Sequence, residues 1–226
     1  MRTPGVGGGG GAELRDALAL VVITDRRLAA PRDPLRVVED ALRAGCRAVQ
    51  LRAKDAAPAE ILRQAHRLRA LTRAHGALLF INDRVDVALA AEADGVHLGP
   101  ADLPVDAVRR WVGARLRIGF STDEPHIARA AERAGADYLG CGAVFGTRTK
   151  DVGGEEIGPD RLDAVARAVA IPVIGIGGIT PENADRVAGT RAAGAAVVGS
   201  VMAATDPGAA TRALLAPFRS RIAGGG

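Results

Sequence analysis

Residues 131–142 read AERAGADYLGCG, and this stretch shows the pattern that decides the fold. It opens as the end of a helical segment, passes the small pair Ala134-Gly135 and continues as a short apolar run. The same arrangement recurs where Ala44-Gly45 precedes AVQLR, Asp94-Gly95 leads into VHLG, and Ala193-Gly194 precedes AAVVG. Each glycine can adopt the left-handed conformation that ends a helix before the next strand. The recurrence predicts repeated helix-to-strand units.

Outward from this stretch, short apolar runs alternate with segments of helical period from Leu18 to about Arg219. The predicted strands are 18–24, 48–53, 77–82, 95–98, 117–121, 137–142, 172–176 and 195–199. The predicted helices are 34–44, 58–74, 84–92, 104–112, 124–134, 159–169, 181–188 and 207–218. Units of near-equal length predict an α/β fold, a single-domain (β/α)8 TIM barrel, with a doubly wound open sheet as the alternative.

Length and composition fit one domain. A chain of 226 residues has the usual size of an α/β barrel and can bury one substantial core. We expect a disordered Gly-rich N-terminus over 1–11, the catalytic barrel domain over 12–220, and a flexible tail over 221–226. Because only 3% of the residues are aromatic, Val, Ile, Leu and Ala must fill the core.

The charge pattern bears on partners. The net charge is +4, but basic residues are mixed with acidic ones along the helical segments, and no basic stripe accompanies them, which argues against nucleic acid. No apolar run reaches the ~18 residues of a membrane span, and the N-terminus does not resemble a signal peptide. Cys46 and Cys141 are interpreted as core residues, which suits a reducing cytoplasm, the expected location. The sequence leaves the oligomeric state open, a homo-oligomer included.

Lysine is rare in this chain. Of the 30 basic residues only Lys54 and Lys150 are lysines, so arginine serves wherever a surface cation is sufficient. A lysine offers a compact charge with three rotatable donors, which the rigid guanidinium fork cannot imitate. Two lysines could also survive by chance. We interpret them as ligands of an anionic group in the active site.

Polar residues follow several predicted strands at the end where barrel enzymes place their chemistry. Alternation sends Gln50, Arg52 and Lys54 to one side of the strand 48–53. Three such side chains inside a closed barrel need anionic or polar partners, which favours an anion site over a solvated edge.

Oxygen ligands follow the next two strands. Asn82 ends the strand 77–82, Asp83 follows it directly, and Asp102 lies in the loop after 95–98. Carboxylate and amide oxygens are the ligands that Mg²⁺ prefers. Helix capping is the alternative interpretation, since Asp and Asn are common N-caps, and the spacing leaves both open.

Two further segments are typical of phosphate binding. Thr147, Thr149 and Lys150 follow the strand 137–142 on a long loop that could close over phosphate oxygens. Glycines after the last two strands, including Gly178 and the Gly199-Ser200 pair, suit the phosphate pocket of (β/α)8 enzymes. Close packing of strand on helix is the alternative reason for glycine there.

Two residues near these segments are assigned supporting roles. Ser121 lacks the context of a strained nucleophile, so we interpret it as a hydrogen-bond donor. His97, on the strand 95–98, is interpreted as a core histidine with satisfied hydrogen bonds rather than a base.

Taken together, the motifs resemble the thiamine phosphate synthase family over about residues 18–205. The matching segments are VQLRAK, INDRVDVALAAEADGVHLGPADLP, GFS, DYLGCGAVFGTRTK, IPVIGIGGI and VVGS. The resemblance implies a Mg²⁺-dependent transferase of thiamine biosynthesis. It would join hydroxymethylpyrimidine diphosphate to a thiazole phosphate, with the carboxylated thiazole as a further candidate, and release thiamine phosphate and diphosphate. The family is thought to work by a dissociative substitution.

The resemblance also implies roles for individual residues. The pyrimidine diphosphate would be contacted by Gln50, Arg52, Lys54, Asn82, Ser121 and Lys150, with Arg52, Lys54, Ser121 and Lys150 as the catalytic set. Asp83 and Asp102 would bind the metal. The thiazole phosphate would be contacted by Thr147, Thr149, Gly178, Gly199 and Ser200.

The chain departs from the family pattern at a few positions. Pro100 and Ala143 replace a Gln and a Pro, and Gly146 replaces a Pro before the T-x-T-K loop. Asp123 stands where this family and the related thiazole tautomerases often have His. Because the tautomerases are thought to use that His, Asp123 argues against a tautomerase, one of two alternatives. The other is a non-catalytic sensor of thiamine precursors.

Overall fold

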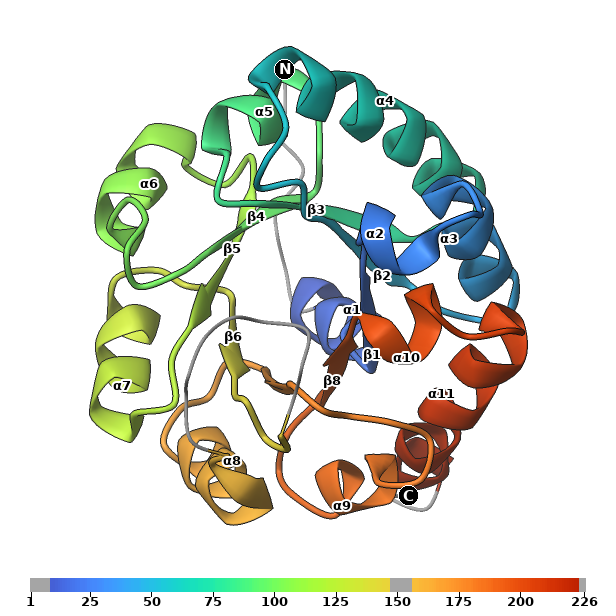
Figure 1. Ribbon diagram of the computed structural model, residues 1–226. Coiled ribbons are helices and arrows are strands. Elements are labelled where there is room, and N and C mark those ends of the chain that lie inside the picture. Colours follow the sequence, from blue (N-terminus) through green and yellow to red (C-terminus); the bar gives the residue numbers. More distant parts are fainter. Residues whose placement is uncertain (1–8, 147–155, 224–226) are drawn as a thin grey trace.

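The computed structural model describes residues 9–146 and 156–223, and these form a closed barrel of parallel strands (Figure 1). The strands are β1 (Leu20–Ile23), β2 (Ala48–Leu51), β3 (Leu78–Asn82), β4 (Gly95–Leu98), β5 (Arg117–Ser121), β6 (Tyr138–Cys141), β7 (Val173–Ile176) and β8 (Gly194–Val197). Each pairs in parallel with its neighbour in sequence, and β8 closes the ring on β1. The predicted (β/α)8 barrel is confirmed, and the open sheet is wrong because β1 and β8 are paired.

The helices lie around the barrel, apart from the first, which lies near the centre of the view in Figure 1. They are α1 (Gly9–Ala17), α2 (Arg26–Ala29), α3 (Pro34–Arg43), α4 (Pro58–Ala74), α5 (Val85–Ala90), α6 (Val105–Val112), α7 (Pro125–Arg133), α8 (Gly158–Arg167), α9 (Ala184–Ala188), α10 (Gly199–Met202) and α11 (Pro207–Ala223). Among these described helices, none is both long enough and apolar enough to cross a bilayer.

Three helices were not predicted, each for a recognisable reason. Helix α1 begins at Gly9, inside the segment expected to be disordered, and its glycines are poor helix formers. Helices α2 and α10 span 4 residues each, too short for a helical period to be visible. Helix α11 likewise continues to Ala223, into the expected tail. Residues 1–8 and 224–226 lie outside the described part of the chain.

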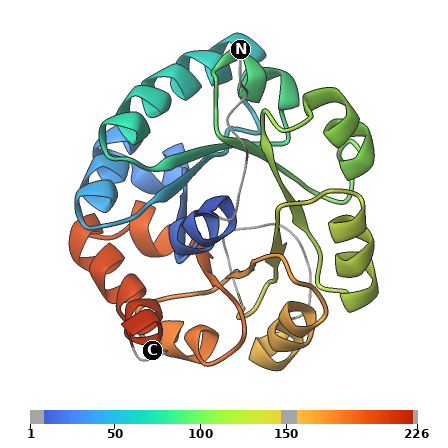
Figure 2. The ribbon, with the colours of Figure 1, turned by 180° about the vertical axis from the view of Figure 1, so that it is seen from behind.

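The barrel interior is filled by side chains from alternate positions of the strands. Val21, Phe80, Tyr138 and Ile174 form one buried cluster there, together with Leu14 of α1 and Leu18, which follows that helix. Helix α1 lies across one end of the barrel in Figure 2, so that it closes the end opposite the strands' carboxyl termini. The rings of Phe80 and Tyr138 meet edge to face with centroids 5.2 Å apart. Two of the few aromatic residues thus pack inside the barrel.

The glycines that precede strands have two different purposes. Gly45 and Gly135 have φ values of +108° and +101°, which confirms the predicted left-handed caps. The prediction is wrong for Gly95 and Gly194, which lie in strands. A Cβ at Gly194 would lie 2.0 Å from the carbonyl oxygen of Leu18, so close backbone approach requires glycine there.

Two Arg–Asp pairs tie the helical layer to the strands. Asp94, just before β4, accepts hydrogen bonds from Arg69 of α4 and from a backbone N–H of β3. Asp137, just before β6, does the same with Arg109 of α6 and a backbone N–H of β5. Because each carboxylate fixes the start of the preceding strand, these pairs help to set the geometry of the polar half of the barrel.

Candidate active site

A pocket of about 720 Å³ opens at the carboxyl ends of the strands. This volume lies in the range of small-molecule sites, and the location is that of barrel enzyme active sites. Every predicted site residue within the described chain lines this pocket: Gln50, Arg52, Lys54, Asn82, Asp83, Asp102, Ser121, Gly178, Gly199 and Ser200. The predicted residues Thr147, Thr149 and Lys150 lie outside the described residues.

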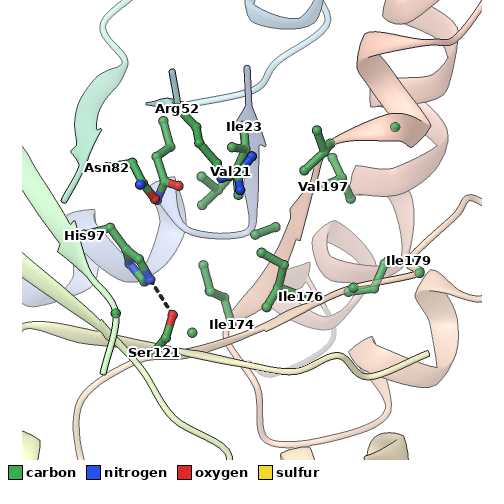
Figure 3. Close-up of a pocket in the computed structure, with 18 of the residues that line it drawn as sticks. Val21, Ile23, Arg52, Asn82, His97, Ser121, Ile174, Ile176, Ile179 and Val197 are labelled. Carbon is green, nitrogen blue, oxygen red and sulfur yellow. Dashed lines mark hydrogen bonds between the residues drawn. The ribbon is translucent and has the colours of Figure 1, made fainter. Parts of the chain in front are cut away.

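The pocket has a polar half and an apolar half (Figure 3). One side is lined by Asn82, His97 and Ser121, on the strands β3 to β5, and by Arg52, directly after β2. The opposite side is built from β1, β7 and β8, where Val21, Ile23, Ile174, Ile176 and Val197 line the wall. The site can therefore hold a charged ligand beside a ring with little polarity.

Asp83 and Asp102 lie together in the polar half and are hydrogen bonded to each other. Burial raises the pKa of Asp83 from 3.8 to about 6, and the hydrogen bond and charge of Asp102 add to this rise. Lys54 and Arg52 lower the pKa of Asp83 by smaller amounts, so both cations lie close enough to act on the carboxylate. The pair is a cluster of hard oxygens whose negative charge is only partly neutralised by the protein.

The structure also tests helix capping as the reason for these carboxylates. Arg84 is the N-cap of α5 and Pro104 that of α6, and neither helix has a side-chain cap. The Asp102 carboxylate instead accepts from the Gly99 N–H at 2.7 Å and so fixes the turn after β4. Asp83 has a φ of 63°, a left-handed conformation that is uncommon for a residue with a side chain. Such strain is typical of functional sites.

The glycine segment after β7 lies across the pocket from the Asp pair. Gly177 and Gly178 have φ values of +97° and +62°, and a Cβ on Gly178 would lie 2.5 Å from the carbonyl oxygen of Gly146. Asn183 holds this turn: its side chain donates to the Gly178 carbonyl at 2.9 Å and accepts from the Thr180 N–H at 2.8 Å. The sequence interpretation missed Asn183, although an Asn a few residues after a Gly-rich turn is a usable signal.

The short helix α10 begins at Gly199, directly after β8. The hydroxyl of Ser200 donates to the Ile179 carbonyl, which ties the start of α10 to the segment after β7. The first backbone N–H groups of a helix lack partners within it and attract anions. Barrel enzymes commonly bind phosphate at two loops and a short extra helix placed in this way.

His97 was interpreted as a core histidine, and the structure corrects its location. It is only partly buried and lines the pocket. Its hydrogen bonds are satisfied as expected, to Tyr138 through Nδ1 at 3.0 Å and to Ser121 through Nε2 at 2.9 Å. Tyr138 was not singled out from the sequence at all, because a lone Tyr in an apolar strand gives no signal of its partner.

Fold and pocket together define a class: a (β/α)8 barrel enzyme whose pocket has a glycine-rich turn after β7 and an acidic pair flanked by cations. Comparison with known proteins then gives the family. The profile described as thiamine monophosphate synthase matches residues 20–201. The chain therefore belongs to the thiamine monophosphate synthase family.

Individual relatives agree. The chain is 49% identical to the thiamine-phosphate synthase of Roseiflexus castenholzii, over 85% of this chain and 85% of that protein. A bifunctional thiamine biosynthesis protein of Symbiobacterium thermophilum is 50% identical over 82% of this chain, which spans only 39% of that longer protein. The solved structure of thiamine phosphate pyrophosphorylase from Pyrococcus furiosus matches with a TM-score of 0.83 and 42% identity, covering 92% of this chain and 98% of the other. Neither the tautomerase nor the sensor alternative gains support from these relatives.

Proposed function

We propose that this chain is a thiamine phosphate synthase, a transferase that joins hydroxymethylpyrimidine diphosphate to a thiazole phosphate and releases diphosphate. The observation that supports this most is the two-sided pocket: one half is lined by cations and an acidic pair, and the other by aliphatic side chains and glycines. Family membership gives the reaction class. The composition of the pocket supports the binding of one substrate in each half.

In the polar half, Arg52 and Lys54 would bind the diphosphate of the pyrimidine substrate. The backbone of Arg52 is held by a hydrogen bond from its N–H to the buried Thr24 hydroxyl at 3.1 Å, which supports a fixed position for this cation. Lys150, on the loop outside the described residues, would add a second ammonium. Charge-assisted hydrogen bonds to phosphate oxygens are among the strongest that side chains make.

Asp83 and Asp102 would hold Mg²⁺. The residues fit this ion: the two carboxyl groups lie in contact, and the pKa of Asp83 is raised first by burial and then by Asp102, so a bound cation would stabilise the charged form of the pair. Mg²⁺ is usually bound by one or two carboxylates together with substrate phosphates and water, and two carboxyl groups are what Asp83 and Asp102 offer. When bound, the ion would neutralise charge on the departing diphosphate.

In the apolar half, the thiazole ring would rest on aliphatic residues such as Ile174 and Ile176, with its phosphate on the Gly178 turn and the first amides of α10. Thr147 and Thr149 would contact the same phosphate. An apolar wall next to backbone donors is the usual composition of a site for a small phosphorylated ring.

The reaction then needs no strong base. The bond between the pyrimidine methylene and the diphosphate oxygen breaks, and the electron pair leaves with diphosphate. The thiazole nitrogen uses its lone pair to form the new carbon–nitrogen bond. Gln50, Asn82 and Ser121 would orient the pyrimidine, and the cations would stabilise the charge that develops on the leaving group.

We further propose a cytoplasmic location. Cys46 and Cys141 are free, fully buried thiols, and burial raises the pKa of Cys46 to about 11 and of Cys141 to about 12. Inert thiols of this kind are compatible with a reducing compartment. The expected partners are the two small-molecule substrates.

The direct test is synthesis. Purified protein incubated with both substrates and Mg²⁺ should form thiamine phosphate and diphosphate in equal amounts, detected by mass spectrometry and a diphosphate assay. Omitting either substrate should abolish thiamine phosphate. Well-folded protein that forms no thiamine phosphate would contradict the proposal.

A further inference from the structure

A chain of hydrogen bonds crosses the barrel interior and joins two pocket residues. Gln50 of β2 is hydrogen bonded to Tyr138 of β6, and Tyr138 is bonded to His97 of β4. His97 in turn is bonded to Ser121 of β5, as the dashed line in Figure 3 marks. Gln50 and Ser121 line the pocket, whereas Tyr138 is fully buried beneath it. The two middle residues thus connect the pocket residues Gln50 and Ser121.

The fold makes room for this chain with glycine. In the sheet register, Gly119 of β5 lies between His97 and Tyr138. A Cβ at position 119 would lie 2.5 Å from the His97 Nδ1 atom and 2.2 Å from the Tyr138 Cζ atom. At Gly140, a Cβ would lie 3.2 Å from the His97 Cε1 atom. Any larger residue at 119 would disrupt the contact, so the space is specific to this hydrogen-bond chain.

The polarity of this hydrogen-bond chain depends on which neighbour receives the proton of the buried Tyr138. Burial raises the pKa of Tyr138 far above its ordinary value, so the phenol keeps its proton; the Gln50 hydrogen bond lowers that pKa to a smaller extent. The phenol has a single hydrogen to donate, to the Gln50 amide oxygen or to His97 Nδ1, and the arrangement that we carry into the proposal is the second, in which the Gln50 amide donates to the phenol oxygen. Tyr138 then donates its single proton to His97 Nδ1. A neutral imidazole that accepts at Nδ1 carries its hydrogen on Nε2.

This placement of the hydrogens determines which groups Ser121 and Gln50 present to the pocket. With its hydrogen on Nε2, His97 donates to the Ser121 oxygen, and the Ser121 hydrogen turns toward the ligand. Gln50, whose amide N–H is directed at Tyr138, keeps its amide oxygen for an acceptor role. One donor and one acceptor complement an aminopyrimidine, which has accepting ring nitrogens beside a donating amino group. The opposite tautomer would leave Ser121 with lone pairs only.

We propose that His97 and Tyr138 are positioning residues, which fix Ser121 as a donor and Gln50 as an acceptor toward the pyrimidine of the substrate. This inference rests on the proposed function for the identity of the ligand. The hydrogen-bond relay itself, from Gln50 through Tyr138 and His97 to Ser121, is present in the structure whatever the ligand is. One experiment therefore tests the hydrogen-bond relay without substrate, and a second tests its effect on the reaction.

The first experiment reads the tautomer without catalysis. Protein labelled with ¹⁵N in histidine is examined by NMR at neutral pH without substrate, and His97→Asn identifies the His97 signals among the four histidines. We expect the hydrogen on Nε2 and a hydrogen-bonded Nδ1. Tyr138→Phe, which keeps the ring packing, should return His97 to mixed tautomers. Exposed His66 serves as the reference. A hydrogen on Nδ1 in the wild type would overturn the polarity.

The second experiment asks whether His97 acts through Ser121. His97→Asn cannot reach Ser121, whereas His97→Gln can present an N–H near the place of Nε2. We expect His97→Asn and Ser121→Ala each to lower kcat by about 10- to 100-fold. The double variant should be no worse than Ser121→Ala alone. His97→Gln should restore part of the rate, and KM for the thiazole phosphate should hardly change.

Each outcome has a definite meaning. Additive losses in the double variant would overturn the proposal, because His97 would then act independently of Ser121. If His97→Asn fails to fold, Tyr138→Phe combined with Ser121→Ala provides the same cycle. If the wild type has no synthase turnover, the proposed function fails, and the NMR result alone decides whether the relay exists.

Discussion

Replacing Asp83 by Asn should stabilise the metal-free protein at neutral and alkaline pH while it removes Mg²⁺ binding. The pKa of Asp83 is raised from 3.8 to about 6, first by burial and then by Asp102. A carboxyl group with a raised pKa adds stability below its unfolded pKa, and this stability is lost as pH rises through the folded value. Above about pH 6, the native protein therefore contains an unfavourable carboxylate pair.

The magnitude follows from the size of the rise. A change from 3.8 to about 6 corresponds to about 3 kcal/mol at ~1.4 kcal/mol for each pH unit. Asp83 is only partly buried, so solvent screening reduces this to ~1–1.5 kcal/mol. For a protein of this length, that gain raises Tm by roughly 2–6 °C. Asn also tolerates the left-handed φ of 63° at this position, so the backbone need not change.

The assay is thermal unfolding of metal-free wild type and Asp83→Asn at about pH 8 and about pH 4.5, repeated with Mg²⁺. The variant should gain stability at the higher pH, gain little at the lower pH, and show no rise in Tm with Mg²⁺. Asp86→Asn is the matched control, because hydrogen bonding to Arg84 lowers the pKa of Asp86 and neutralising it brings no gain. Equal destabilisation of Asp83→Asn at both pH values would refute the reasoning.

Three further outcomes are expected. Lys54→Ala and Lys150→Ala should each lower kcat by about 100-fold or more with little change in Tm; equal losses of activity and stability would make these lysines structural. Gly178→Ala should raise KM for the thiazole phosphate, because its Cβ would lie 2.5 Å from a carbonyl oxygen, and an unchanged KM would contradict a phosphate site there. Asp94→Ala leaves the partly buried Arg69 without its carboxylate and should lower the free energy of unfolding by about 3 kcal/mol, with kcat at 25 °C kept. A loss below ~1 kcal/mol would show that the Arg69–Asp94 ion pair contributes little to the free energy of unfolding.

The barrel could be predicted because its strands are short apolar runs that stand out between helical segments. A fully buried parallel strand such as β6, with Leu139 between Tyr138 and Gly140, reads as a short apolar run with a helix on either side. Closure of the barrel, by contrast, depends on the pairing of β1 with β8, a contact between segments far apart in the sequence. The number of units could indicate it, but only the structure contains the pairing.

The site was predictable where alternation and position decide the direction of a side chain. Gln50 lies near the end of β2, Arg52 and Asp83 directly follow β2 and β3, and barrel topology brings such residues to one mouth. The relay was not predictable, because it depends on His97 and Tyr138 meeting across an intervening strand. Only the missing side chain of Gly119 permits that contact, and a single glycine in a strand gives no sign of what occupies its space.

A crystal structure of the protein with Mg²⁺ and diphosphate tests the central claim most directly. We expect one Mg²⁺ bound by oxygens of Asp83 and Asp102 at about 2.0–2.1 Å, with diphosphate oxygens completing its coordination. Arg52, Lys54 and Lys150 should contact the same diphosphate. Diphosphate bound away from the acidic pair, or an acidic pair without metal at saturating Mg²⁺, would contradict the account.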